Sequence, residues 1–157
     1  MEYKKHIRTK NLTLRDIHVG DWVQVWIEMA ERYSPPLKII SICDDGTIYL
    51  VTSDEERPTP WEEDIKNVDA LRITADILKG FGFEVSEMDY DRGTPYQTVD
   101  YKGKYVGALY YYKEEKAYLY VCGYNCLFVH ELIAYNHRNN IHMNLEWKGL
   151  SHEDRID

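Results

Sequence analysis

Polar and apolar residues alternate through the first third of the chain, a pattern that is typical of short strands. Residues 22–27 are rich in Trp, Val and Ile, and the β-rich runs 37–43 and 47–52 flank Asp44-Asp45-Gly46. An Asp-Gly pair between two such runs favours a hairpin, because both turn residues tolerate a positive φ. Residues 16–68 are therefore predicted to form a small β-rich lobe of the SH3-like barrel type.

Beyond this lobe the spacing of apolar residues predicts two helices. Thr74 is a suitable N-cap for a short helix that Gly80 and Gly82 would end. A second helix is predicted over residues 127–138, with Asn125 as its candidate cap. Both helices are short, so packing on the rest of the lobe must hold them in place.

Between the two helices the pattern predicts a three-stranded antiparallel meander. A tight turn at Lys102-Gly103 would place Val99 opposite Val106, and a loop over residues 113–116 would place Tyr111 opposite Tyr118. In this register one face of the sheet is aliphatic and suits burial under the helices, while the other face is mostly tyrosine. The predicted tyrosine face consists of Tyr96, Tyr105, Leu109, Tyr111, Tyr118, Tyr120 and Cys122, and the predicted aliphatic face consists of Val99, Val106, Ala108, Tyr110, Tyr112, Ala117, Leu119 and Val121.

The whole pattern predicts an α+β protein, in which the β-rich lobe precedes a helix–meander–helix–strand lobe. Two polar tails would flank the lobes, and a loop would separate the first helix from the meander. The predicted segments are a basic tail over 1–15, the β-rich lobe over 16–68, the α+β lobe over 69–147 with a loop over 87–95 and a last strand over 141–147, and a polar tail over 148–157.

Two interpretations of the predicted tyrosine face remain open. It can be a structural cover that packs on the first lobe or on another copy of the chain, with its hydroxyls at the wet edge. It can also be a recognition surface, because tyrosine offers a large contact area at a low cost in conformational entropy. The candidate binding residues are Tyr96, Tyr105, Tyr111, Tyr118 and Tyr120.

Composition and charge narrow the classes of function. The 157 residues include 14 Tyr but only 3 Phe, and the formal net charge is -8. Positive charge concentrates in residues 1–15, whereas binding of duplex nucleic acid normally needs a basic structured face. No apolar run approaches the roughly 18 residues of a membrane helix. Because 3 Cys are too few and odd for a disulfide framework, a cytoplasmic setting is expected.

One cluster of residues suggests chemistry. Cys122, Cys126 and His130 form a C-x3-C-x3-H pattern, in which Cys126 and His130 would be neighbours on one helical face. Zinc needs four ligands, so the fourth would have to come from elsewhere. The simpler interpretation is that the cysteines are small buried hydrophobes and that the histidine lies at the surface or caps a helix. No nucleotide-binding or nucleophile-elbow motif is present, and no cofactor is expected.

Three segments, in order, resemble motifs of one family. Residues 17–23 (IHVGDWV) resemble an opening L-R-I-G-N-x-V motif, and residues 70–83 (ALRITADILKGFGF) resemble a P-I-P-L-T-E-E-x-L-x-K-x-G-F helix. Residues 129–132 (VHEL) resemble the start of a Y-V-H-Q-L-Q-N-L-Y-F-A-L-T-G helix. The chain thus resembles a family of small uncharacterised proteins from gut Bacteroidetes and their prophages and mobile elements. The resemblance implies a fold and a cellular setting and is silent on catalysis, and the chain departs from the motif after Leu132.

The leading hypothesis is a cytoplasmic, non-enzymatic binding or adaptor protein whose tyrosine-rich face contacts a protein partner or a second copy of the chain. The first alternative is a metal-binding protein or enzyme centred on Cys122, Cys126 and His130. The second alternative is a binder of single-stranded nucleic acid, in which bases stack on the tyrosines and lysines at the loop tips contact phosphates. Those lysines are Lys102, Lys104, Lys113 and Lys116.

Overall fold

The computed structural model describes residues 10–52, 60–113, 116–138 and 145–149. The chain divides after Leu71 into two units, whereas the sequence analysis placed the boundary after residue 68. Each unit contains one six-stranded antiparallel sheet. Most of the predicted basic tail, the end of the predicted polar tail and residues 141–144 of the predicted last strand lie outside the described residues.

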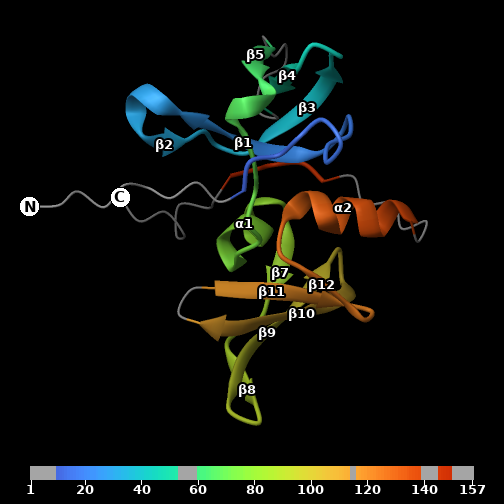
Figure 1. Cartoon of the computed structure of the whole chain (residues 1–157). Helices are drawn as coiled ribbons and strands as arrows, with labels where there is room; N and C mark the ends of the chain where they lie inside the picture. Colours follow the sequence, from blue (N-terminus) through green and yellow to red (C-terminus); the bar gives the residue numbers. More distant parts are fainter. Residues whose placement is uncertain (1–9, 53–59, 114–115, 139–144, 150–157) are drawn as a thin grey trace, which may run out of the picture. The chain divides into compact units, whose positions relative to one another are not determined.

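The first unit is built on a sheet in which the central strand β1 pairs with three others. The order is β2-β1-β3-β4-β5, and β6 also pairs with β1 (Figure 1). Two short 3-10 helices, Glu28–Ala30 and Ile65–Asn67, connect strands. The strands are β1 (Trp22–Ile27), β2 (Arg32–Tyr33), β3 (Leu37–Ile42), β4 (Thr47–Val51), β5 (Trp61–Asp64) and β6 (Val68–Ala70).

The predicted hairpin at Asp44-Asp45-Gly46 is confirmed. It joins β3 to β4, and the side chain of Asp45 accepts a 2.9 Å hydrogen bond from the backbone N–H of Thr47. Gly46 has a φ of +95°, which a residue with a side chain rarely adopts. The hairpin therefore follows from local turn chemistry, as the sequence analysis expected.

The core of the first unit is mostly aliphatic, and it also contains Trp22 and two buried aspartates, Asp21 and Asp69. Trp22, Val23 and Leu37 are at most 1% exposed. Asp69 is fully buried, and the hydroxyl of Tyr33 donates a 2.6 Å hydrogen bond to it. This bond offsets part of the cost of removing the carboxyl group from water.

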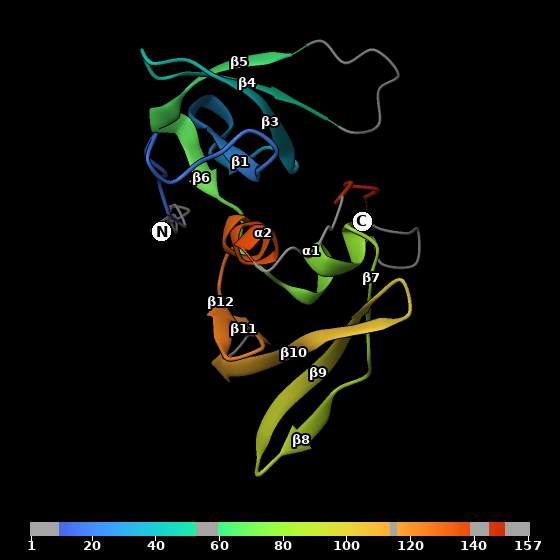
Figure 2. The ribbon, with the colours of Figure 1, turned by 90° about the vertical axis from the view of Figure 1, so that its right-hand side faces the viewer.

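The second unit combines a six-stranded sheet with two helices. The order is β12-β11-β10-β9-β7, and β8 also pairs with β9. Both views place the two helices on one side of this sheet (Figures 1 and 2). The elements are α1 (Ala75–Gly80), β7 (Phe83–Val85), β8 (Asp89–Asp91), β9 (Thr94–Tyr101), β10 (Lys104–Lys113), β11 (Lys116–Val121), β12 (Tyr124–Cys126) and α2 (Val129–Arg138).

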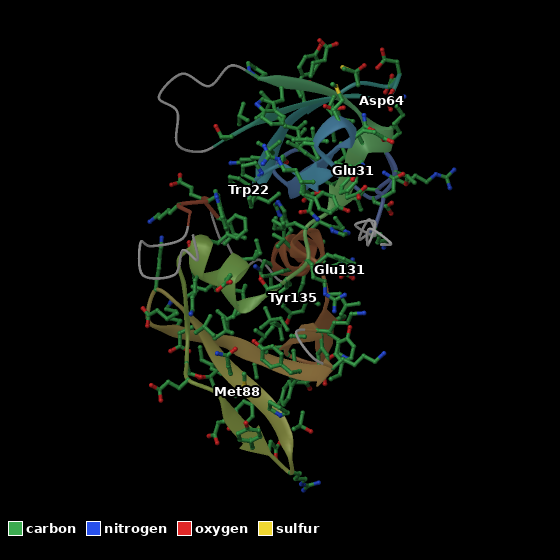
Figure 3. All side chains as sticks on the ribbon, turned by 90° about the vertical axis from the view of Figure 1, so that its left-hand side faces the viewer. Trp22, Glu31, Asp64, Met88, Glu131 and Tyr135 are labelled. Atoms are coloured by element: carbon green, nitrogen blue, oxygen red, sulfur yellow. The ribbon has the colours of Figure 1, made fainter. Side chains whose placement is uncertain are left out.

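The two helices begin for different reasons. The prediction for α1 is confirmed, because the Thr74 hydroxyl accepts a 3.1 Å hydrogen bond from the N–H of Ile77 as an N-cap. The predicted start of α2 is wrong, because Asn125 lies in β12 and the helix begins at Val129. Glu131, which projects from α2 (Figure 3), accepts hydrogen bonds from the two backbone N–H groups that precede the helix.

The predicted fold class is wrong: the part of the chain that the structure describes is mostly β, with 50% of its residues in strands and 18% in helices. Three strands, β7, β8 and β12, extend the expected meander. The residue pairs Arg92-Gly93 and Cys122-Gly123 both have positive φ angles, as Lys102-Gly103 does, and such pairs make tight hairpin turns. The predicted loop over 87–95 is therefore largely a hairpin, and residues 145–147 of the predicted last strand are not in a strand.

Candidate functional site

The register of the meander differs from the prediction because β10 contains two bulges. Val99 pairs with Gly107 instead of Val106, and the register shifts between Tyr105 and Gly107. A Cβ at Gly107 would lie 2.2 Å from the carbonyl oxygen of Tyr120. Glycine therefore lets β10 approach β11 closely at the point where the strand bends.

The second bulge lies between Tyr111 and Lys113, where the register of β10 against β11 shifts by one residue. Tyr111 pairs with Ala117 instead of the predicted Tyr118, and Tyr118 pairs with Tyr110, so the prediction is wrong by one residue. A slip of one residue exchanges the two faces of a strand. The side chains of the middle strand after the first bulge therefore lie on the faces opposite to those predicted.

This exchange changes the membership of the tyrosine-rich face. Tyr111 and Leu109 belong to the buried face, where the Tyr111 hydroxyl bonds to the Gln97 side chain. Burial is the main reason that the pKa of Tyr111 is raised. Tyr110 and Tyr112 take their places on the other face. We call the resulting set of contacting rings the tyrosine ladder: Tyr96, Tyr110, Tyr112, Tyr118 and Tyr120.

Four of the ladder rings form a stacked series. The ring centroids of Tyr96 and Tyr110 lie 5.6 Å apart, those of Tyr110 and Tyr118 5.8 Å, and those of Tyr118 and Tyr112 6.1 Å, with interplanar angles of 25–29°. Tyr120 stands edge-on to Tyr110, at 6.5 Å and 82°. Each such pair contributes about 0.5–1.5 kcal/mol beyond its area burial, so the rings hold one another in place.

The ladder is accessible to solvent. Tyr112 is 51% exposed and Tyr120 is 44% exposed, while the other three rings are half-buried. Leu109 and Leu119, which alternate with ladder residues along β10 and β11, are fully buried. The ladder thus lies on the open face of a sheet whose other face belongs to the core. Tyr105, 67% exposed, shares the ladder face because its partner Asp100 lies four residues from Tyr96 along β9, and residues an even number apart share a face.

Carboxylates border the ladder on the side of β7 and β8. Asp89 pairs with Tyr96, and Glu84 pairs with Asp100, so their side chains share the ladder face. The charge of Asp89 is the main reason that the pKa of Tyr96 is raised. The pKa of Tyr110 is raised chiefly by burial and next by the charge of Asp91. We call Glu84, Asp89, Asp91 and Asp100 the acidic border.

The opposite end of the ladder is basic. Nη2 of Arg72 donates hydrogen bonds to the Tyr112 hydroxyl, at 2.7 Å, and to the carbonyl of Ala117, at 3.1 Å. Lys113 and Lys116 pair across the ends of β10 and β11. The ladder therefore runs from a negative border to a positive end.

The structure does not assemble the predicted C-x3-C-x3-H cluster. Cys122 is exposed in a hairpin turn with a φ of +45°, and Cys126 lies in β12 opposite Leu119. His130 lies on α2, where its ring stacks on Phe128 at 5.9 Å. The prediction that Cys126 and His130 share a helical face is therefore wrong. Within the described residues, no group of three or more His, Cys, Asp or Glu side chains is placed to hold a metal ion.

Cys126 is also a poor nucleophile. Burial, and next the charge of Glu131, raise the pKa of its thiol to about 11. Reactive cysteines need the opposite shift, because the thiolate is the nucleophile and the metal ligand. The observed environment is that of a packed core thiol.

Sequence reasoning found four of the six tyrosines on this face, Tyr96, Tyr105, Tyr118 and Tyr120, but missed Tyr110 and Tyr112. The available signal was Gly107, because a glycine inside a strand often marks a bulge. The acidic border was missed because β7 and β8 were not expected to be strands. The Arg-Gly pair at residues 92–93, within the predicted loop, was the signal for this hairpin.

Comparison with models of known families, with curated proteins and with solved structures found no match. The resemblance to proteins of gut Bacteroidetes therefore stays a prediction. In the described part of the chain, neither helix has the length and apolar character needed to cross a membrane.

Proposed function

We propose that this chain is a non-enzymatic binding protein and that the tyrosine ladder contacts a protein partner. The observation that carries the proposal is the series of stacked, partly exposed rings on the open face of the sheet. A cytoplasmic setting and a mobile-element origin belong to the same proposal, and they rest on the cysteine count and the family resemblance.

The physical basis is preorganisation. Binding normally loses side-chain entropy when flexible residues become ordered, and rigid aromatic groups reduce that cost. The ladder rings are already ordered by their neighbours, with Tyr110 in contact with three of them. Tyrosine is also among the residues that dominate binding energy when they lie at the centre of an interface.

The size of the face limits the partner. β9 has 8 residues, so β8 to β11 span about 27 by 19 Å at about 3.4 Å per residue and about 4.8 Å per strand. This is roughly 500 Å², below the about 800 Å² that each partner contributes to a standard interface. A peptide segment or a transient domain contact fits this area better than a large obligate interface.

Single-stranded nucleic acid is the other occupant that an aromatic face can take. Here the four carboxylates of the acidic border lie on the same face, where they would repel phosphates. The charge of the face therefore favours a protein partner.

The test uses a partner isolated with the full chain as bait and then purified. Its affinity is measured for the wild type, for Tyr112→Ser with Tyr120→Ser, and for the control Tyr90→Ser with Tyr124→Ser. The control tyrosines are 66% and 54% exposed and lie outside the ladder. We expect the ladder variant to bind about tenfold or more weakly, since truncation of two exposed aromatic residues in an interface costs more than about 1.4 kcal/mol.

Equal losses in the two double variants, or an unchanged affinity of the ladder variant, would contradict the proposal. Circular dichroism of each variant checks that the fold is kept. Sedimentation of the wild type over a wide concentration range shows whether the partner is a second copy of the chain.

A further inference from the structure

We infer that the ladder recognises a cationic segment of its partner, an extended peptide that places an arginine or lysine side chain between the rings and the acidic border. The inference rests on the proposed function, and it names the chemistry of the partner. It follows from the charges around the ladder, the angle between its rings and a contact that the second unit already makes.

No salt bridge to a lysine or arginine neutralises the acidic border in the part of the chain that the structure describes. Asp89 accepts hydrogen bonds from the backbone N–H of Tyr90, at 2.8 Å, and from the Tyr96 hydroxyl, at 3.4 Å. Both donors are neutral, so the negative charge remains to attract a partner.

The rings add a second attraction for a cation. The face of an aromatic ring carries negative potential and attracts ammonium or guanidinium groups within about 6 Å of its centre. Tyr120 stands at 82° to Tyr110, so the two rings form a corner. A cation seated there would meet two aromatic surfaces, with Asp91 close enough to affect the pKa of Tyr110.

The same unit already binds one guanidinium group in this way. The guanidinium of Arg72 lies 5.7 Å from the centre of the Phe128 ring, and it also donates to the Tyr112 hydroxyl. Arginine combines a flat stacking surface with fixed donors, which suits a site that offers rings and oxygen atoms together. The arrangement at the acidic border offers the same two features to an external side chain.

The charge gradient also orients the partner. Arg72, Lys113 and Lys116 lie at the end of the ladder near Tyr112, so a cationic side chain is repelled there and attracted towards Tyr96. We therefore place the cationic residue of the partner near Tyr96 and the corner between Tyr110 and Tyr120, and its neutral or acidic residues near Tyr112.

The test measures binding of the amidated, acetylated peptide Gly-Arg-Gly-Arg-Gly-Arg-Gly to the full chain by calorimetry at low salt. The test variant is Asp89→Asn with Asp91→Asn. The control, Glu28→Gln with Glu31→Gln, makes the same change in net charge on exposed residues of the first unit. We expect the wild type to bind, the test variant to bind about tenfold more weakly, and the control to stay within about twofold of the wild type.

Several results would overturn the inference. These are an absence of binding by the wild type, an equal loss in the control, an unchanged affinity in the test variant, or stronger binding of oligothymidine or of the matching glutamate peptide.

The two proposals fail separately. If the isolated partner loses affinity for the Tyr112 and Tyr120 variant but keeps it for the Asp89 and Asp91 variant, the binding function stands and the cationic recognition is wrong. If the tyrosine substitutions leave partner affinity unchanged, the binding function itself is wrong.

Discussion

The substitution Gly80→Ala tests how residues 145–149 pack on the second unit. A Cβ at Gly80 would lie 2.1 and 2.3 Å from two ring atoms of Trp147. The same ring packs edge-on against Phe81, with centroids 5.1 Å apart, and the N–H of Lys148 donates a 2.8 Å hydrogen bond to the Gly80 carbonyl. The end of α1 therefore meets the Trp147 ring where only a glycine leaves room.

Two effects of opposite sign decide the change in stability. Alanine favours the helix over glycine by up to about 1 kcal/mol, and α1 includes Gly80 without a left-handed φ. Overpacking costs about 1–3 kcal/mol when a neighbouring ring must move. We expect a net loss of about 1–2 kcal/mol in the free energy of unfolding. The Trp147 ring cannot move away freely, because it packs against Phe81 and because the neighbouring Lys148 is hydrogen-bonded to the Gly80 carbonyl.

The assay is urea unfolding of the full chain, followed by circular dichroism, for Gly80→Ala, Trp147→Ala and the double variant. In the Trp147→Ala background the ring that the methyl group would meet is gone, so the Gly80→Ala change should become neutral or stabilising. The two substitutions should therefore show a coupling of about 1–3 kcal/mol. A stabilising effect of Gly80→Ala in the wild-type background would refute the packing argument.

Two further predictions concern buried polar groups. The pKa of Cys126 is raised to about 11 from an ordinary value of 9.0. Its thiol should therefore resist iodoacetamide at pH 8 while the exposed Cys122 reacts, which mass spectrometry of the labelled protein measures. Equal labelling of the two cysteines would contradict this prediction. The stability that the neutral Cys126 thiol contributes is complete below pH 9 and is lost as the pH rises towards 11, which chemical unfolding at alkaline pH can measure against Cys126→Ala. Tyr33→Phe removes a 2.6 Å hydrogen bond to the buried Asp69. The free energy of unfolding, measured by urea titration, should therefore fall by about 1–3 kcal/mol. An unchanged unfolding midpoint would show that the hydrogen bond contributes nothing to stability.

Local chemistry made several features predictable from the sequence. The hairpin at Asp45-Gly46, the turn at Lys102-Gly103 and the helix capped by Thr74 all depend on residues within a few positions of one another. Their geometry is set by φ preferences and by short-range hydrogen bonds, which the order of the residues already specifies. The same rule applies to Cys122-Gly123, although the sequence analysis placed Cys122 on a face of the meander.

The membership of the candidate surface could not be predicted in this way. It depends on whether Val106 or Gly107 lies opposite Val99, and that choice follows from how closely β10 approaches the carbonyl of Tyr120 on β11. Strand alternation specifies two faces, but a bulge exchanges them without any change in the pattern of residues. The abundance of tyrosine in this segment was visible in the sequence, whereas the outward side of the sheet was not.

The amino-acid sequence by itself determined the turns, the first helix, the rich supply of tyrosine and the acidic balance of the chain. Only the tertiary structure decided that Tyr110 and Tyr112 face outward, that Tyr111 faces inward, and that Asp89 lies beside Tyr96. The physical reason is range: turn and cap preferences act between neighbours in the chain, while register and the meeting of β8 with β9 depend on contacts between strands that only the packed sheet brings together.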